Sequence, residues 1–246
     1  MSDSFGIIVV GDEILNGRRR DRHFDAIGGT LRERGFAVAW LRILPDDPDY
    51  LVAEFTRSMA EGKPVFCCGG IGATPDDHTR ACAARAAGVP LVMHPGAVAE
   101  IEARFGADAY PNRIRMAELP QDSELIPNPY NRIPGFSINR HYFMPGFPDM
   151  AHPMAAWVLD THYGAGGLPE RQRAVQVRGV TESQLMDLMQ QLTTDFPQVK
   201  LFSLPRLGAD YQIELGFRGQ GDLDAPFAAL LAGLEERGVA YDLLSD

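Results

Sequence analysis

Cysteine is scarce in this sequence, and long apolar runs are missing from it. The 246 residues include three cysteines, an odd number whose spacing fits neither a disulfide framework nor a zinc site. No apolar run approaches the roughly 18–20 residues of a membrane span, and the N-terminal residues lack the basic and apolar regions of a secretory signal. These absences predict a protein of the reducing cytoplasm with no membrane partner.

A surplus of positive charge is also missing. The chain has 23 Lys and Arg residues against 33 Asp and Glu residues, a formal net charge of −10. This balance argues against nucleic acid as a partner, because phosphate backbones repel an acidic surface. The hydrophobic fraction of 45% is ordinary for a soluble globular protein, and the length suits one large domain or two small ones.

Several catalytic signatures are absent as well. The sequence contains no Walker P-loop, no dinucleotide-binding G-x-G-x-x-G after its first strand, no nucleophile elbow and no H-x-x-x-H pair. Cys67 and Cys68 are poor nucleophile candidates, because the apolar run 65–68 would bury and deactivate their thiols. Glycines and acids therefore remain as the residues that could carry chemistry.

The rest of the chain is organised around a glycine-rich stretch at 69–79, which reads G-G-I-G-A-T-P-D-D-H-T. An apolar run precedes it and an alanine-rich segment follows, so a strand–loop–helix junction is predicted. Thr74 is predicted as the helix N-cap, with Pro75 at the first helical position and Asp77 at the third. The N–H groups at such a helix start favour an anion, phosphate above all. The glycines that permit the tight turn are Gly69, Gly70 and Gly72.

Two acids stand where that phosphate would bind. Asp76 and Asp77 would repel a bare phosphate, but they would accept one bridged by Mg²⁺ or another hard cation, because carboxylates supply oxygen ligands. The alternative is that Asp77 only caps the helix and Asp76 only complements its dipole. From this stretch alone, the two interpretations have similar weight.

Strand and helix patterns alternate over the first part of the chain, which implies a parallel sheet covered by helices on both faces. The region 108–138, rich in proline and asparagine, is predicted to be irregular and functional. Because ligands bind at the carboxyl ends of parallel strands, the loops 11–17 and 69–79 are expected to share one crevice. The predicted strands cover 5–10, 36–44, 65–68, 91–93 and 141–144. The predicted helices begin near 21, 48, 75, 95 and 148.

The glycine-rich segment 164–169 is a plausible linker. After it, the predicted order is β-α-β-β-α-β, the ferredoxin-like arrangement of a small α+β domain. The domains are therefore placed at 1–165 and 170–246. Both parts carry a net charge of about −5 by residue count, so neither is a basic reader of nucleic acid.

Polar residues outside the glycine stretch complete a candidate site. Four acids from loops and helix starts could hold one divalent cation and orient a water for attack on a phosphoanhydride: Glu13, Asp21, Asp76 and Asp77. Asparagine and arginine pairs of the irregular region could bind ligand oxygens or a heteroaromatic edge: Asn112, Arg113, Asn131 and Arg132. Asp21 is equally well explained as a helix N-cap. The run 18–20 is either a solvated loop or a positive rim that attracts phosphates.

An ordered set of motifs resembles the MoaB/Mog molybdopterin-binding domain, and most closely the N-terminal part of the competence/damage-inducible protein A (CinA) family. The motifs are G-D-E-I-L-x-G at 11–17, an aspartate at 21, G-G-I-G-x-T-x-D-D-x-T at 69–79, P-G-F at 134–136 and P-G-x-P at 145–148. The C-terminal part resembles the small domain that follows in that family. Three positions depart from the pattern: Cys68 replaces a hydroxyl residue, Ala73 a proline and His23 an asparagine.

The resemblance implies a three-layer α/β/α domain with a mostly parallel sheet. It implies a phosphate held by 69–74, with Asp76 and Asp77 at a Mg²⁺, Mn²⁺ or Co²⁺ ion. Two functions follow: a molybdopterin-binding protein of molybdenum-cofactor biosynthesis, or a metal-dependent pyrophosphatase of ADP-ribose, in which Asp76 and Asp77 are catalytic. A homo-oligomer is expected, and a pure interaction module is a weaker third reading. The residues expected to bind the cofactor are Gly11, Glu13, Gly69, Gly70, Gly72, Thr74, Asn112, Arg113, Pro145 and Gly146.

Overall fold

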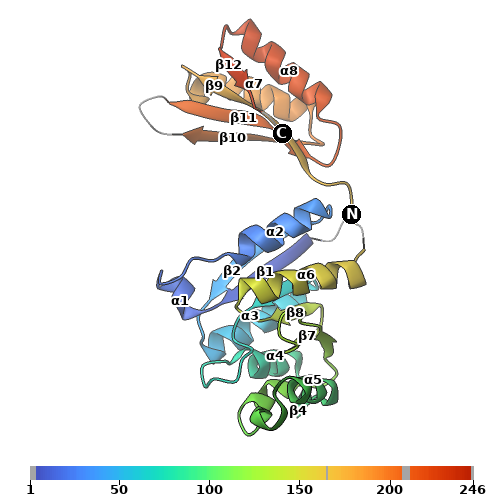
Figure 1. The fold of residues 1–246 in the computed structure, drawn as a ribbon. Coiled ribbons are helices and arrows are strands. Elements are labelled where there is room, and N and C mark those ends of the chain that lie inside the picture. Colours follow the sequence, from blue (N-terminus) through green and yellow to red (C-terminus); the bar gives the residue numbers. More distant parts are fainter. Residues whose placement is uncertain (1–3, 165, 207–210, 245–246) are drawn as a thin grey trace. The chain divides into compact units, whose positions relative to one another are not determined.

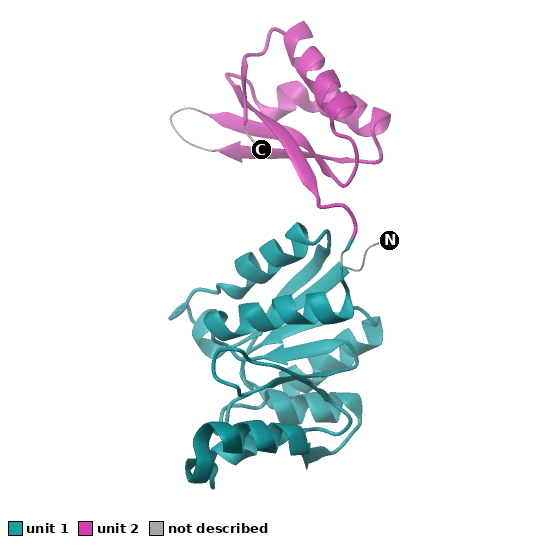
Figure 2. Ribbon diagram, turned by 45° about the vertical axis from the view of Figure 1, so that its right-hand side comes forward, with its two compact units in different colours: residues 1–166 teal, residues 167–246 magenta. Residues whose placement is uncertain are grey.

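The computed structural model describes residues 4–164, 166–206 and 211–244. The chain divides into two compact units, residues 1–166 and 167–246 (Figure 2). The division falls inside the glycine-rich segment that was predicted as a linker. Each unit has its own hydrophobic core, so each is described by itself.

The first unit is built on a six-stranded sheet in the order β2-β1-β3-β8-β7-β6 (Figure 1). Strands β2, β1, β3 and β8 run parallel, whereas β7 and β6 continue the sheet in antiparallel pairings. The strands of this sheet are β1 (Ser4–Val10), β2 (Ala37–Leu44), β3 (Val65–Cys68), β6 (Glu124–Ile126), β7 (Gly135–Ile138) and β8 (His141–Met144). The predicted mostly parallel sheet is confirmed.

Helices cover both faces of this sheet, which makes the unit a three-layer α/β/α fold. Alternate residues of β1 point to opposite layers, because side chains alternate along a strand. Phe5 and Ile7 lie in the core beneath α2 and α6, and Ile8 and Val10 in the core beneath α3, α4 and α5. The helices are α1 (Asp12–Leu15), α2 (His23–Glu33), α3 (Pro48–Glu61), α4 (Thr79–Ala87), α5 (Pro95–Phe105) and α6 (Pro148–His162).

The region 108–138 is more regular than its composition predicted. It holds two 3₁₀ turns, η1 (Gly106–Ala109) and η2 (Arg113–Ala117), and the short strands β5 (Glu118–Pro120), β6 and β7. These strands have three or four residues, too few to show a hydrophobic period. The predicted strand at 91–93 forms as β4 (Leu91–Met93), but it pairs with β5 in a separate ribbon rather than with the large sheet.

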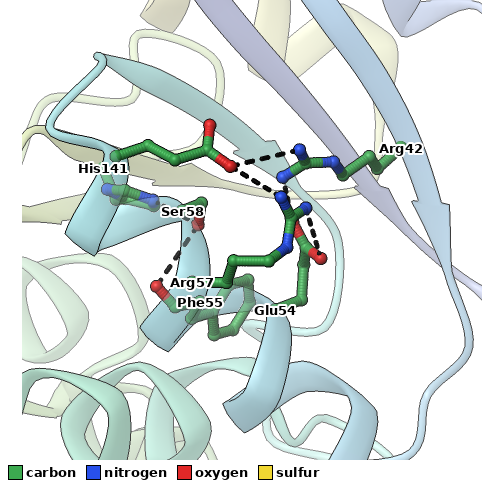
Figure 3. A network of polar contacts seen from close by, with 7 residues as sticks. Arg42, Glu54, Phe55, Arg57, Ser58 and His141 are labelled. Carbon is green, nitrogen blue, oxygen red and sulfur yellow. Dashed lines mark hydrogen bonds and ion pairs between the residues drawn. The ribbon is translucent and has the colours of Figure 1, made fainter.

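A polar contact connects α3 to the start of β8 (Figure 3). His141 is fully buried, and its Nε2 lies 2.8 Å from the hydroxyl of Ser58. Its Nδ1 donates to the carbonyl of Asn139 at 3.0 Å, which leaves Nε2 as the acceptor in the neutral ring. Burial lowers the pKa of His141, which favours this neutral form. Beside it, Glu54 accepts hydrogen bonds from both Arg42 and Arg57.

The second unit is a four-stranded antiparallel sheet with two helices. The sheet order is β10-β11-β9-β12, and alternate strand residues such as Val175, Val177, Ile213 and Leu215 form a core with the helices. In chain order the elements are β9 (Arg171–Arg178), α7 (Glu182–Asp195), β10 (Lys200–Arg206), β11 (Gln212–Gly219), α8 (Asp224–Glu236) and β12 (Tyr241–Leu243). The predicted β-α-β-β-α-β order is confirmed. Within the described ranges of both units, no helix is long and apolar enough to cross a membrane.

Candidate functional site

A pocket of about 460 Å³ opens at the carboxyl ends of the parallel strands in the first unit. Each of the four parallel strands is followed by residues that line it. Gly11, Glu13 and Arg19 follow β1, and Asp46 follows β2. Residues 69–74, Asp76 and Asp77 follow β3, and residues 145–147 follow β8. The loops 11–17 and 69–79 therefore share one crevice, as the sequence predicted.

The first two glycines of the 69–72 loop have backbone angles that side chains rarely adopt. Gly69 has φ of 113° and Gly70 has φ of 67°. A Cβ at Gly69 would lie 2.2 Å from the backbone oxygen of Val10, and one at Gly70 would lie 2.3 Å from Oγ1 of Thr79. Glycine is required here by both conformation and space.

Four successive carbonyls of this loop are held from behind by the first two residues of α4. Thr79 and Arg80 are buried and donate all four hydrogen bonds. The bonds are Thr79 Oγ1 to Gly69 O at 3.0 Å, Thr79 N to Gly70 O at 3.0 Å, Arg80 Nε to Ile71 O at 3.1 Å and Arg80 Nη2 to Gly72 O at 2.7 Å.

This anchoring orients the amide groups of the loop. In a trans peptide, the N–H points opposite to the carbonyl of the preceding residue. The N–H groups of residues 70–73 therefore point away from α4, and they bond to no acceptor among the described residues. Because these residues line the pocket, the loop is a cradle of backbone donors suited to an anion.

The helix start predicted at 74–77 is wrong. Helix α4 begins at Thr79, with His78 as its N-cap. The side chain of Asp77 accepts the backbone N–H of Thr74 at 2.8 Å and its hydroxyl at 2.5 Å, which closes a separate turn. Asp77 therefore braces the loop rather than capping α4, and its Oδ2 lies 2.5 Å from where a Cβ of Gly72 would be.

Acidic side chains also line the pocket: Glu13, Asp46 and Asp76, called the acidic wall below. Oδ2 of Asp46 accepts the backbone N–H of Asp12 at 2.9 Å. Burial raises the pKa of Asp46, and the nearby charges of Asp12, Glu13 and Asp76 raise it further. Asp76 itself is exposed, and its pKa is lowered, chiefly by the neighbouring Thr74.

Asp46 was not predicted as a site residue. The turn at 45–49 reads as a helix start, and Asp47 does cap α3 by accepting from Asp49 and Tyr50. The position of Asp46 directly after β2 was the available signal, because β2 is paired with β1 and their carboxyl ends meet.

Four predicted residues lie outside this pocket. Asp21 accepts the backbone N–H groups of His23 and Phe24, so its carboxylate serves the start of α2. Arg113 lies over the ring of Phe105 at 4.5 Å and donates to a backbone carbonyl. Asn112 is exposed and precedes η2. Of the two later polar residues, Asn131 lines the pocket and Arg132 pairs with Glu100.

The predicted set of four metal ligands is not assembled. Asp21 is occupied elsewhere, and the described residues contain no group of three or more His, Cys, Asp or Glu side chains positioned to hold a metal ion. The carboxylates of the pocket could therefore supply only part of a coordination shell. Mg²⁺ is commonly bound in this way, by one or two carboxylates together with ligand phosphates.

An apolar wall, absent from the sequence-based prediction, completes the pocket. Met116, Ile133, Phe147 and Met150 line it together with the amide of Asn131. Phe147 is 59% exposed, so its ring is available to a ligand. The site thus combines a donor cradle, an acidic wall and an apolar surface suited to a ring system.

This fold, with a glycine loop and acids at the carboxyl edge of a parallel sheet, defines an α/β small-ligand-binding protein. Residues 6–162 match the family model described as "Probable molybdopterin binding domain", and the chain belongs to that family. The resemblance stated from the sequence motifs is thereby confirmed.

Known relatives agree with this assignment. A CinA-like protein of Citrifermentans bemidjiense is 30% identical over 98% of this chain and 59% of its own length. The chain spans about half the length of such CinA-like relatives. The crystal structure of the protein CinA, of unknown function, from Thermoplasma acidophilum matches with a TM-score of 0.59 and 28% identity, covering 63% of this chain and 96% of that one.

Proposed function

We propose that the first unit binds molybdopterin, a phosphorylated pterin, as part of molybdenum-cofactor biosynthesis, with its phosphate at the glycine loop. One observation carries this proposal: four successive carbonyls are held by Thr79 and Arg80, so the N–H groups of residues 70–73 remain available to an anion. The apolar wall beside Phe147 and the amide of Asn131 supply surfaces for the pterin ring. Family membership supports the ligand class.

The acidic wall suggests that the phosphate arrives with a divalent cation, Mg²⁺ or alternatively Mn²⁺ or Co²⁺. One or two of the carboxylates of Glu13, Asp46 and Asp76 would contribute oxygen ligands, with the rest supplied by the phosphate and water. A bound cation would neutralise charge that otherwise opposes an anion in this pocket. The raised pKa of Asp46 supports this assignment: burial raises it most, and the nearby charges of Asp12, Glu13 and Asp76 raise it further.

The same acidic cluster favours a second candidate function, metal-dependent pyrophosphatase activity on ADP-ribose. Asp76 and Asp77 remain the proposed catalytic residues in this alternative. Asp76 would act directly, through its exposed carboxylate. Asp77 would act indirectly, by accepting the hydrogen bonds that hold the turn at Thr74. The apolar wall would then bind the base of the nucleotide.

One experiment separates these functions. Purified protein is titrated with molybdopterin, and phosphoanhydride cleavage of ADP-ribose is measured with Mg²⁺, Mn²⁺ or Co²⁺. Submicromolar pterin binding without cleavage would support the binding protein, and turnover abolished in Asp76→Asn would support the pyrophosphatase. Asp25→Asn is the matched control, because Asp25 is an exposed acid on α2 outside the pocket. If the protein shows neither pterin binding nor turnover of ADP-ribose, both proposals are refuted.

Self-association and location remain predictions. We expect a homo-oligomer in the cytoplasm, with no nucleic-acid partner. Light scattering of the purified chain would test the first point, and a monomer at micromolar concentration would contradict it.

A further inference from the structure

Arg80 is an unusual residue in this fold, because its guanidinium is buried and bonds only to backbone carbonyls. The residue is 7% exposed, and among the described residues no carboxylate lies within ion-pair distance of it. Two of its acceptors belong to the glycine loop, Ile71 and Gly72. A buried charge is costly unless its hydrogen bonds are satisfied, so these bonds are strongly favoured.

The other two acceptors lie on a separate segment of the pocket. Nη1 of Arg80 donates to the carbonyls of Arg115 at 2.6 Å and Glu118 at 2.9 Å. These residues flank Met116, which belongs to the apolar wall. One side chain therefore connects the glycine loop to the segment that carries Met116 of the apolar wall.

We propose that Arg80 is a positioning residue for anion binding, which aims the N–H groups of Gly72 and Ala73 at the ligand by holding the carbonyls of Ile71 and Gly72. This inference rests on the proposed function of the same pocket. Without the guanidinium, either peptide can rotate and present its oxygen to the anion instead of its N–H. The buried positive charge also lies on the side of the loop where its carbonyls point, and it attracts an anion bound to the N–H groups on the other side.

Arginine suits this task better than lysine. A guanidinium presents five N–H donors in a rigid planar fork, four of which meet carbonyls here. A lysine ammonium keeps the charge but concentrates its three donors at one point, so it cannot reach carbonyls on both segments. Arg80→Lys therefore separates the orienting role from simple charge.

The test uses the full chain and inorganic pyrophosphate as the probe, in the presence of Mg²⁺. Dissociation constants are measured by calorimetry, and the amides are followed in ¹⁵N-labelled protein by NMR. We expect Arg80→Lys to weaken binding by about tenfold or more, the loss of one or two oriented bonds to a charged ligand. Arg85→Lys, an exposed position on the same helix, should change affinity by less than about twofold.

The NMR pattern distinguishes orientation from general loosening. In the unaltered protein, pyrophosphate should shift the amide signals of residues 70–73. In Arg80→Lys, the shifts at Gly72 and Ala73 should be lost. Those at Gly70 and Ile71 should persist, because Thr79 holds the preceding carbonyls.

Three results would overturn the inference. Unchanged affinity in Arg80→Lys would exclude the positioning role while leaving the proposed function intact. If pyrophosphate no longer shifts any of the four amide signals in Arg80→Lys, Arg80 stabilises the loop as a whole and does not orient particular N–H groups. Failure of the unaltered protein to bind pyrophosphate would refute the anion loop itself. If Arg80→Lys does not fold, the same spectra are recorded on Arg80→Gln, whose amide keeps a planar pair of donors, and the same criteria apply.

Discussion

Replacing Gly70 by alanine tests whether the loop requires glycine for space as well as for conformation. Gly62 is the matched control, because it has φ of 70° against 67° at Gly70, and a Cβ at Gly62 would meet nothing within 4 Å. An L-residue in this left-handed region costs about 1–2 kcal/mol, partly offset by the lower chain entropy of alanine in the unfolded state. Both substitutions share these effects.

Only Gly70→Ala adds a collision. Its Cβ would lie 2.3 Å from Oγ1 of Thr79, so the hydroxyl must leave the carbonyl of Gly69. A lost hydrogen bond costs about 0.5–1.5 kcal/mol net, and displacement of a buried side chain adds to this. We therefore expect Gly70→Ala to lower the free energy of unfolding by about 1–2 kcal/mol more than Gly62→Ala.

Urea unfolding followed by tryptophan fluorescence measures this difference in the first unit alone. The protein has two tryptophans, Trp40 and Trp157, and both lie in that unit. Calorimetry with pyrophosphate should show that Gly70→Ala loses binding and Gly62→Ala keeps it. Equal destabilisation by both substitutions, or retained binding in Gly70→Ala, would refute the reasoning.

Four further outcomes are expected. The first unit should lose stability as the pH falls below about 6.5, because burial lowers the pKa of His141 in the folded state, so that the unfolded chain binds a proton more readily. A urea midpoint that stays constant between pH 7 and 5 would contradict this. Ser58→Ala should lower the free energy of unfolding by about 1–3 kcal/mol at pH 7, because it removes the hydroxyl that donates to Nε2 of His141. Asp46→Asn should strengthen pyrophosphate binding without metal and weaken it with Mg²⁺, measured by calorimetry with and without EDTA; a change of the same sign in both conditions would contradict the metal assignment. Cys67 and Cys68 should resist a thiol reagent in native protein and react in urea, because burial raises both thiol pKa values; rapid native labelling would show that β3 opens.

The order of elements could be predicted from sequence where hydrophobic periods are long. β1 and α3 are examples: β1 contains the apolar run at residues 5–10, and α3 has an aspartate cap, a proline at its start and a glycine at its end. Strands β5 to β7 could not be predicted, because three or four residues define no period and their pairing is set by tertiary contacts.

The site could also be predicted only in part from the sequence. Its glycines and most of its acids are adjacent in sequence to strand ends, so topology alone brings them together. The start of α4 was misplaced because Asp77 bonds back to Thr74 and closes a turn, a choice that local propensity leaves open. The role of Arg80 depends on carbonyls up to 38 residues away, which no local pattern reveals.

The pocket combines two features that oppose each other when either acts alone. The amide cradle and the buried charge of Arg80 attract an anion, whereas the carboxylates of Glu13, Asp46 and Asp76 in the same pocket repel it. A cation alone is also poorly held, because the acids do not form a complete ligand set among the described residues. Anion and cation should therefore bind cooperatively, each raising the affinity of the other by the same factor, as linkage requires.

Titrating pyrophosphate at several Mg²⁺ concentrations, and Mg²⁺ at several pyrophosphate concentrations, measures both factors after correction for the complex they form in solution. If the two ions bind independently, the acidic side chains do not hold a cation that bridges to the anion at the glycine loop.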